Sequence, residues 1–369
     1  MILLVLFIAA CLLAYANGAN DNFKGVATLF GSGTTNYKKA INWATITTLL
    51  GSVSAFFLAG ELVKNFSGKG LVPDLLIQSP EFAISIALGA GLTVLLATKI
   101  GMPISTTHSL VGALLGSGLV AVGSSFNFAK LGGTFLFPLM ISPLMAAIVS
   151  LIGYVIFRQL RLMSGITKDT TIELGDEIVQ TTAAVALTEG SSQNLSSAVI
   201  HQSMMEKYNG RLLGISAQKL LDFAHYLSAG IVSFARGLND TPKIAGLLLF
   251  IHVLDIRVSL ISIGLMMAIG GLINAKRVGH TVSKKITRMN HGQGFTANLF
   301  TGILVTTASI HGMPVSTTHV SVGSIFGIGM VTKKADTRVI RNILLSWLLT
   351  LPVAALCSAL VYLVIINLY

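Results

Sequence analysis

Four long apolar stretches restrict what this chain can fold into. They cover residues 41–60, 135–157, 256–275 and 343–366. Each has about the 20 residues that a helix needs to cross a bilayer. Charged residues make up only 11% of the 369 residues, against about a quarter in an average soluble domain, so they are too few to cover a water-facing surface. The sequence therefore predicts an all-α polytopic membrane protein with about 10–12 membrane segments.

The positions of the basic residues predict how the chain is oriented. A net charge of +11 could indicate a nucleic-acid partner, but the lysines and arginines gather between the apolar stretches, so no such partner is expected. Basic loops are found at 38–39, 158–219, 276–288 and 333–341, whereas the loops at 61–80 and 124–134 carry few basic residues. Because cytoplasmic loops are enriched in Lys and Arg, the basic loops are placed inside. We expect a multi-pass protein of the cell membrane with both termini outside.

An eight-residue motif occurs twice in the chain. Residues 101–108 read Gly-Met-Pro-Ile-Ser-Thr-Thr-His, and residues 312–319 differ only by Val for Ile. The charge pattern puts stretch 81–123 between two outside loops and stretch 292–331 between two inside loops, so the two copies approach from opposite faces. This plan is typical of secondary transporters, whose site lies between inverted repeats near the midplane.

The repeats also suggest a division of the chain. We expect a first membrane repeat at 1–157, a polar cytoplasmic linker at 158–211 and a second membrane repeat at 212–369. The two repeats should have inverted topology, with broken or re-entrant helices that meet near the midplane. Gly112 and Gly116 match Gly323 and Gly327 at a constant offset, and this small-residue spacing predicts close helix packing.

Each half also carries an Asn-Asp pair, at Asn20-Asp21 and Asn239-Asp240. An aspartate in the centre of a membrane helix costs about 2.5–3.5 kcal/mol, so it should face a partner or a water-filled cavity. A structural ion pair with the lysine three residues later is one explanation. Duplication of the whole Asn-Asp unit favours a functional site. Carboxylate, amide and backbone oxygens are a hard ligand set, suited to sodium or to protonation.

The Ser-Thr-Thr units predict helix starts. Pro103 and Pro314 are suited to the first turn of a helix, so helices should begin near Ser105 and Ser316. The exposed N–H groups and the helix dipole favour an anion there. Ordinary helix capping by Ser or Thr is the alternative. Two copies, each in a membrane segment beside an aspartate, favour anion binding.

The doubled Asn-Asp and Pro-Ile/Val-Ser-Thr-Thr-His signatures resemble those of the inorganic phosphate transporter (PiT) family. The resemblance implies cation-coupled phosphate uptake, usually with sodium and sometimes with protons, on an inverted-repeat helical fold. By position it implies these phosphate-binding residues: Asp21, Asn22, Ser105, Thr106, Thr107, Asp240, Thr241, Ser316, Thr317 and Thr318. Lys24 and Lys243 depart from the small or amide residues that family members often carry there, which bears on the coupling ion more than on the substrate.

These inferences combine into one hypothesis, the import of inorganic phosphate coupled to sodium by alternating access. At about 5 Å and an effective dielectric constant of about 20, each like-charge pair costs roughly 3 kcal/mol, so phosphate should bind beside the aspartates only after cations neutralise them. About two sodium ions are expected, with phosphate bridging them. The expected sodium ligands are Asn20, Asp21, Ser105, Asn239, Asp240 and Ser316. No covalent cofactor is expected, and the oligomeric state is left open.

Four alternatives follow from the same residues. Within transport, the chain could be a proton-coupled phosphate carrier or a permease for sulfate or another oxyanion. A channel is a third alternative, although paired broken elements of opposite orientation favour alternating access. The two membrane aspartates could also form the dyad of an intramembrane aspartyl protease, but such an enzyme has no need for the surplus of anion donors.

Overall fold

Long helices dominate the computed structural model, which describes residues 1–173, 203–212, 214–249, 255–285, 289–335 and 337–368. The helices of the first half are α1 (Ile2–Asp21), α2 (Ala27–Gly31), α3 (Tyr37–Leu58), α4 (Gly60–Phe66), α5 (Asp74–Ile77), α6 (Pro80–Lys99), α7 (Thr106–Val122), α8 (Phe128–Lys130) and α9 (Phe137–Met163). Those of the second half are α11 (Ala217–Ala245), α12 (Ile256–Asn274), α13 (Lys276–Lys285), α14 (His291–Ile310), α15 (Thr317–Thr332) and α16 (Thr337–Leu368).

The membrane character of the fold is confirmed. Within the described residues, seven helical segments are long and apolar enough to cross a membrane. The four apolar stretches of the sequence correspond to α3, α9, α12 and α16. Helix α9 continues past residue 157, the expected end of the first membrane repeat, and ends at Met163. Its last turns carry basic residues.

Helices of each half pack on helices of the other half. Helix α1 packs on α12 of the other half, and α11 packs on α3. In the same way α7 packs on α16, and α15 packs on α9. Corresponding helices thus make corresponding contacts across the halves, and the two largest hydrophobic clusters contain residues of both halves.

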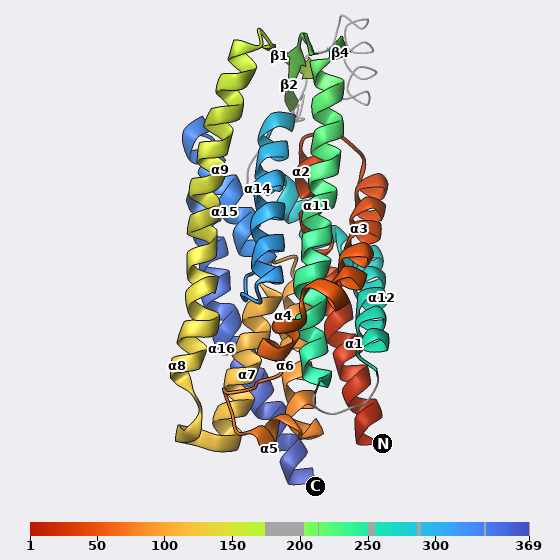
Figure 1. The fold of residues 1–369 in the computed structure, drawn as a ribbon, viewed down its shortest axis with the longest axis vertical. Coiled ribbons are helices and arrows are strands. Elements are labelled where there is room, and N and C mark those ends of the chain that lie inside the picture. Colours follow the sequence, from red (N-terminus) through yellow and green to blue (C-terminus); the bar gives the residue numbers. More distant parts are fainter. Residues whose placement is uncertain (174–202, 213, 250–254, 286–288, 336, 369) are drawn as a thin grey trace, which may run out of the picture.

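Two helical hairpins meet in the middle of the molecule. Hairpin α6–α7 lies in the lower part of Figure 1 and hairpin α14–α15 in the upper part. Their tips, which carry the two copies of the repeated motif, exchange hydrogen bonds. Thr107 Oγ1 donates to the Val315 carbonyl at 3.3 Å, and Thr318 Oγ1 donates to the Ile104 carbonyl at 3.3 Å. Each motif therefore holds the backbone of the other.

The spaced glycines allow the close helix contacts that the sequence predicts. A Cβ atom added at Gly116 would lie 2.0 Å from the Ala355 carbonyl oxygen of α16. A Cβ atom added at Gly327 would lie 2.0 Å from the Ala147 carbonyl oxygen of α9. One turn earlier in each helix, a Cβ atom added at Gly112 would lie 2.3 Å from the Leu351 carbonyl oxygen of α16, and one at Gly323 would lie 2.2 Å from the Pro143 carbonyl oxygen of α9. Only glycine fits these positions without moving a backbone, so the prediction is confirmed.

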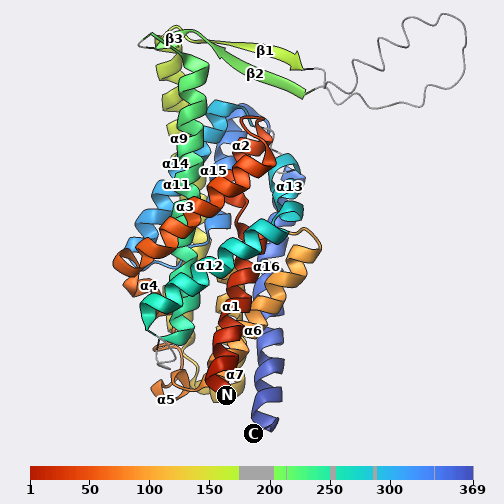
Figure 2. The same cartoon turned by 90° about the vertical axis from the view of Figure 1, so that its right-hand side faces the viewer.

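A small β region lies at the end of the molecule opposite both termini (Figure 1). Strands β1 (Thr167–Glu173) and β2 (Ser203–Asn209) pair in antiparallel fashion and extend sideways from the bundle in Figure 2. Strands β3 (Arg211–Leu212) and β4 (Ile215–Ser216) form a second short pair. Residues 167–173 and 203–209 of the expected linker are thus strand structure outside the helical bundle, whereas residues 158–163 belong to α9. Tyr208 Oη fixes it to α14 by donating to Asn290 Oδ1 at 3.2 Å.

Candidate phosphate site

The two aspartates lie together at the middle of the helical bundle. Asp21 is the last residue of α1, and Asp240 lies near the end of α11. Both are buried, with 5% and 4% of their surface exposed. Asn17 joins them, because its Nδ2 group donates to Asp21 Oδ2 at 3.3 Å and to Asp240 Oδ2 at 3.2 Å. The Asn-Asp units of the two halves therefore form one site.

The helix starts predicted at the two hairpin tips are confirmed. Ser105 is the N-cap of α7, and its side chain accepts a hydrogen bond from the His108 backbone N–H at 3.2 Å. Ser316 is the N-cap of α15 and accepts from the His319 backbone N–H at 3.3 Å. Both serines thus do the capping that was the alternative to anion binding. A bound anion would share these N-terminal turns with them.

The threonines of the two motifs face the Asn-Asp units. Thr106 Oγ1 donates to Asp21 Oδ2 at 3.0 Å. On the other side, Asn239 Nδ2 donates to Thr317 Oγ1 at 3.2 Å and to Asp240 Oδ1 at 3.0 Å. All these side chains are buried. The motif that the sequence repeats thus meets the aspartates in three dimensions.

Each aspartate is paired with a buried lysine. Lys24 Nζ lies 2.5 Å from Asp21 Oδ1, and it also donates to the Ile104 carbonyl at 2.7 Å and to Thr318 Oγ1 at 2.8 Å. These three oxygens belong to α1, to the α6–α7 connection and to α15, and together they surround the ammonium group. The ion pair considered from the sequence is present, and it is part of the site itself.

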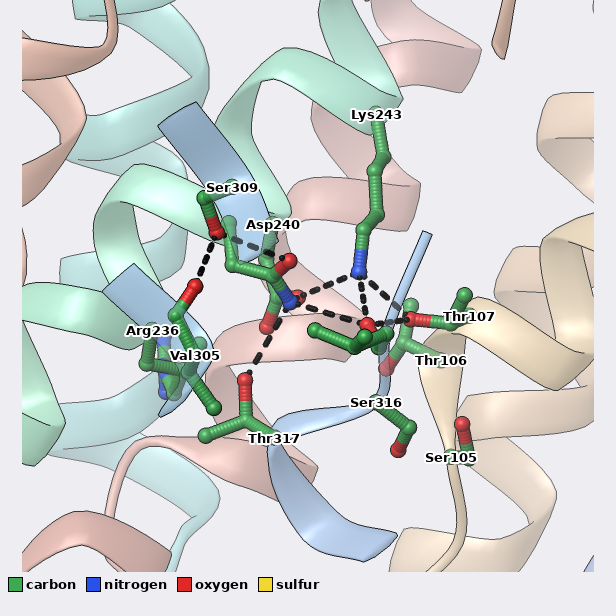
Figure 3. A network of polar contacts seen from close by, with 12 residues as sticks. Ser105, Thr106, Thr107, Arg236, Asp240, Lys243, Val305, Ser309, Ser316 and Thr317 are labelled. Atoms are coloured by element: carbon green, nitrogen blue, oxygen red, sulfur yellow. Dashed lines mark hydrogen bonds and ion pairs between the residues drawn. The ribbon is translucent and has the colours of Figure 1, made fainter. Parts of the chain in front are cut away.

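Lys243 repeats this arrangement in the second half. Its Nζ donates to the Val315 carbonyl at 2.6 Å, to Thr107 Oγ1 at 2.7 Å and to Asp240 Oδ1 at 3.5 Å. Figure 3 shows this half of the cluster, where Lys243 reaches toward Thr107. Each lysine therefore contacts the aspartate of its own half and the hairpin tips of both halves.

The asparagines of the Asn-Asp pairs hold the hairpin tips in place. Asn20 Nδ2 donates to the Met102 carbonyl at 3.0 Å, and Asn20 Oδ1 accepts from the Ile104 backbone N–H at 3.2 Å. Asn239 Oδ1 accepts from Ser309 Oγ at 3.2 Å. The amide oxygens expected to bind sodium therefore accept hydrogen bonds from the protein in this state.

Asn22 and Thr241 donate hydrogen bonds to side chains of α3. Asn22 Nδ2 donates to Thr45 Oγ1 at 2.9 Å, and Thr241 Oγ1 donates to Ser52 Oγ at 2.7 Å. Both side chains are fully buried. The structure thus brings Thr106, Thr107 and Thr318 to the aspartates and lysines, and Thr317 to Asn239. Ser105 and Ser316 cap their helices, and Asn22 and Thr241 turn toward a neighbouring helix.

Sequence reasoning missed two residues of the site, Asn17 and Arg236. Arg236 is 1% exposed, and its Nη2 donates to Asn17 Oδ1 at 3.5 Å. A signal was available, because each residue stands four positions before the aspartate of its half. Residues four apart share one helix face, so a polar residue there in an apolar helix points to the same site as the aspartate.

The charges of this cluster suit an anion. Three cationic side chains, Lys24, Arg236 and Lys243, lie with two carboxylates in a buried setting, which leaves one positive charge in excess if all five are ionised. Figure 3 shows Arg236 and Lys243 on opposite sides of Asp240 in that view. The hydroxyls of Thr317 and Ser316 accept hydrogen bonds in this arrangement, so each has a proton that it could donate to an oxyanion oxygen.

Fold and site together define a multi-pass membrane protein with a buried cluster of charged and polar side chains between two related halves. The phosphate transporter family matches residues 17–358, so the chain belongs to that family. The chain is 28% identical to a protein of Pyrococcus abyssi named "Putative phosphate permease", over 98% of this chain and 97% of the relative. It is 25% identical to an inorganic phosphate transporter of Arabidopsis thaliana chloroplasts, over 93% of this chain and 68% of the relative.

A solved structure shares the whole fold. The structure named "The sodium-dependent phosphate transporter" is similar with a TM-score of 0.78 and 25% sequence identity, and the match covers 100% of both chains. The family and the relatives consist of permeases and transporters, so this chain is a transport protein and not an intramembrane protease.

Proposed function

We propose that this phosphate transporter family member is a secondary active transporter that imports inorganic phosphate by alternating access. The observation that carries the proposal is the meeting of both repeated motifs and both aspartates in one buried cluster between the halves. Substrate sites of secondary transporters lie at such repeat interfaces. The excess positive charge of the cluster attracts an anion to it.

Alternating access needs two bodies that move against each other around the site. We assign 1–157 and 212–369 as the two membrane repeats and 158–211 as the cytoplasmic linker, and each moving body would contain helices of both repeats, because the helices of one repeat pack on those of the other. Support comes from the exchanged packing of corresponding helices and from hairpins that enter from opposite ends of the molecule (Figure 1). Movement of one body would open the site first to one side of the membrane and then to the other. The basic loops favour a cytoplasmic linker and outside termini.

Sodium is the coupling ion in the first form of this proposal. Oxygens of Asp21, Asp240 and the neighbouring carbonyls and hydroxyls form hard ligand sets that suit sodium. The structural relative, which is named as a sodium-dependent protein, supports the same ion. Each net positive charge moved inward gains about 2.3 kcal/mol per 100 mV of membrane potential, so sodium entry could drive phosphate uptake.

Proton coupling is a second candidate, and the two lysines favour it. Their ammonium groups already contact Asp21 and Asp240, the two carboxylates among the expected sodium ligands, together with neighbouring carbonyl and hydroxyl oxygens. A sodium ion must therefore displace an ammonium to reach either aspartate at these oxygens. If the ammonium groups stay in place, the aspartates are already neutralised, and phosphate binding needs no sodium.

Uptake into proteoliposomes tests the proposal. Vesicles with the purified chain receive labelled phosphate under an inward sodium gradient, or under an inward proton gradient in choline buffer. We expect phosphate uptake that Asp21→Asn abolishes and that Asp74→Asn, an exposed control in α5, leaves unchanged. The gradient that drives uptake identifies the coupling ion. Absence of phosphate uptake in both gradients would overturn the proposal, and equal competition by sulfate would replace phosphate with a broader oxyanion class.

A further inference from the structure

Arg236 has hydrogen-bonding capacity that the protein does not use. It is 1% exposed and is the largest of the fully buried side chains in the described residues. Its Nη2 group makes one long hydrogen bond, 3.5 Å to Asn17 Oδ1. Its Nε and Nη1 atoms have no hydrogen-bond partner among the described residues. An arginine cannot lose its charge in a protein, so burial without partners needs a physical explanation.

The location of Arg236 links it to the aspartates. Asn17, which accepts from Arg236, donates to both carboxylates. The guanidinium is thus one side chain away from Asp21 and from Asp240. Across the described part of the chain, the amide of Asn17 is the hydrogen-bonded link between this cation and the carboxylate pair.

Arg236 is also the point at which the duplication of the site is broken. The Asn-Asp-x-x-Lys pattern recurs at an offset of 219 residues, and the same offset relates Asn17 to Arg236. Lys24 neutralises Asp21 and Lys243 neutralises Asp240, so the positive charge of Arg236 is the one left in excess. In a site that bound only cations, an additional buried arginine would repel the bound ion.

We propose that Arg236 is the anchor for the phosphate anion, with one of its unpartnered groups, Nε or Nη1, and the neighbouring Nη2 donating side by side to two phosphate oxygens. The planar guanidinium matches tetrahedral oxyanions because it presents parallel N–H groups. The carboxylates nearby accept hydrogen bonds only from a protonated oxygen. Phosphate at neutral pH carries such a proton and sulfate does not, so the pairing of Arg236 with Asp21 and Asp240 selects phosphate. This inference rests on the proposed function.

Equilibrium binding of labelled phosphate to the purified full chain in detergent tests the anchor. Arg236→Lys keeps the charge but loses the planar pair of donors, and Arg236→Gln removes the charge. We expect the phosphate dissociation constant to rise at least about tenfold in Arg236→Lys and more in Arg236→Gln, as for the loss of hydrogen bonds to a charged group. Arg257→Gln, on the exposed start of α12, is the control that should bind as the wild type does.

A second measurement separates binding from folding. Phosphate should raise the melting temperature of the wild type, and this rise should shrink in both Arg236 variants. If Arg236 had only a structural role, its substitution would lower the melting temperature and leave the phosphate-induced rise unchanged. That result would overturn the proposal that Arg236 anchors phosphate. If Arg236→Gln does not fold, Arg236→Lys decides the question alone. Wild-type protein that neither binds nor transports phosphate would refute the proposed function, whereas a binding wild type with unaffected variants would refute only the anchor.

Discussion

Replacing Lys24 by glutamine tests whether its ammonium group stands in for a coupling cation. Lys24 and Asp21 form an ion pair of 2.5 Å, and their side chains are only 5–6% exposed. Removing one partner of such a buried pair costs about 3–5 kcal/mol, because the remaining charge stays buried without its counter-ion. We expect Lys24→Gln to lower the melting temperature of the full chain in detergent and choline chloride.

Sodium should reverse part of this loss. The substitution frees Asp21 Oδ1, the Ile104 carbonyl and Thr318 Oγ1, three hard oxygens that suit a sodium ion. An ion whose free concentration is 100 times its dissociation constant stabilises the folded state by about 2.7 kcal/mol. In sodium chloride at equal ionic strength, the melting temperature of Lys24→Gln should therefore rise by more than that of the wild type.

Lys64→Gln provides the matched control. Lys64 and Glu61 form an ion pair of similar length, 2.7 Å, with the same sequence spacing, but both side chains are more than 60% exposed. Exposed pairs contribute about 0–1 kcal/mol, so this variant should melt like the wild type in both salts. Equal melting temperatures for Lys24→Gln and Lys64→Gln would refute the buried-pair argument. A destabilised Lys24→Gln that responds equally to sodium and choline would refute the cation-site argument.

Two further predictions concern packing and the linker. Gly116→Ala should lower the melting temperature strongly, because its Cβ would lie 2.0 Å from the Ala355 carbonyl oxygen, whereas Gly60→Ala, with nothing within 4 Å, should have little effect; equal melting of the two variants would contradict this. Burial alone would raise the pKa of Glu206, but hydrogen bonds from Lys168 and other donors lower it from 4.5 to about 2. Because the unfolded chain takes up the proton first, stability is lost as pH falls from about 4.5 toward 2. Glu206→Gln should flatten this acid dependence of the melting temperature, and an unchanged profile would show that the carboxylate contributes nothing.

The sequence was sufficient for features that depend on local physics. Apolar length predicted the four membrane stretches that α3, α9, α12 and α16 contain. The motif prolines with Ser105 and Ser316 predicted two helix starts, since capping depends only on residues within one turn. The glycine spacing predicted close packing in α7 and α15, because a missing side chain shows in the sequence directly. Duplication predicted that both halves contribute to one site.

The contacts across the halves needed the tertiary structure. Lys24 meets Thr318 and Asn17 meets Asp240 across more than 200 residues, and such pairs depend on how helices cross rather than on local pattern. The sequence by itself determined that this is a duplicated helical membrane protein with its polar groups concentrated in repeated motifs. Only the tertiary structure decided that lysines fill the oxygen sets and that Nε and Nη1 of Arg236 remain unpartnered among the described residues, because burial and distance arise when distant helices pack together.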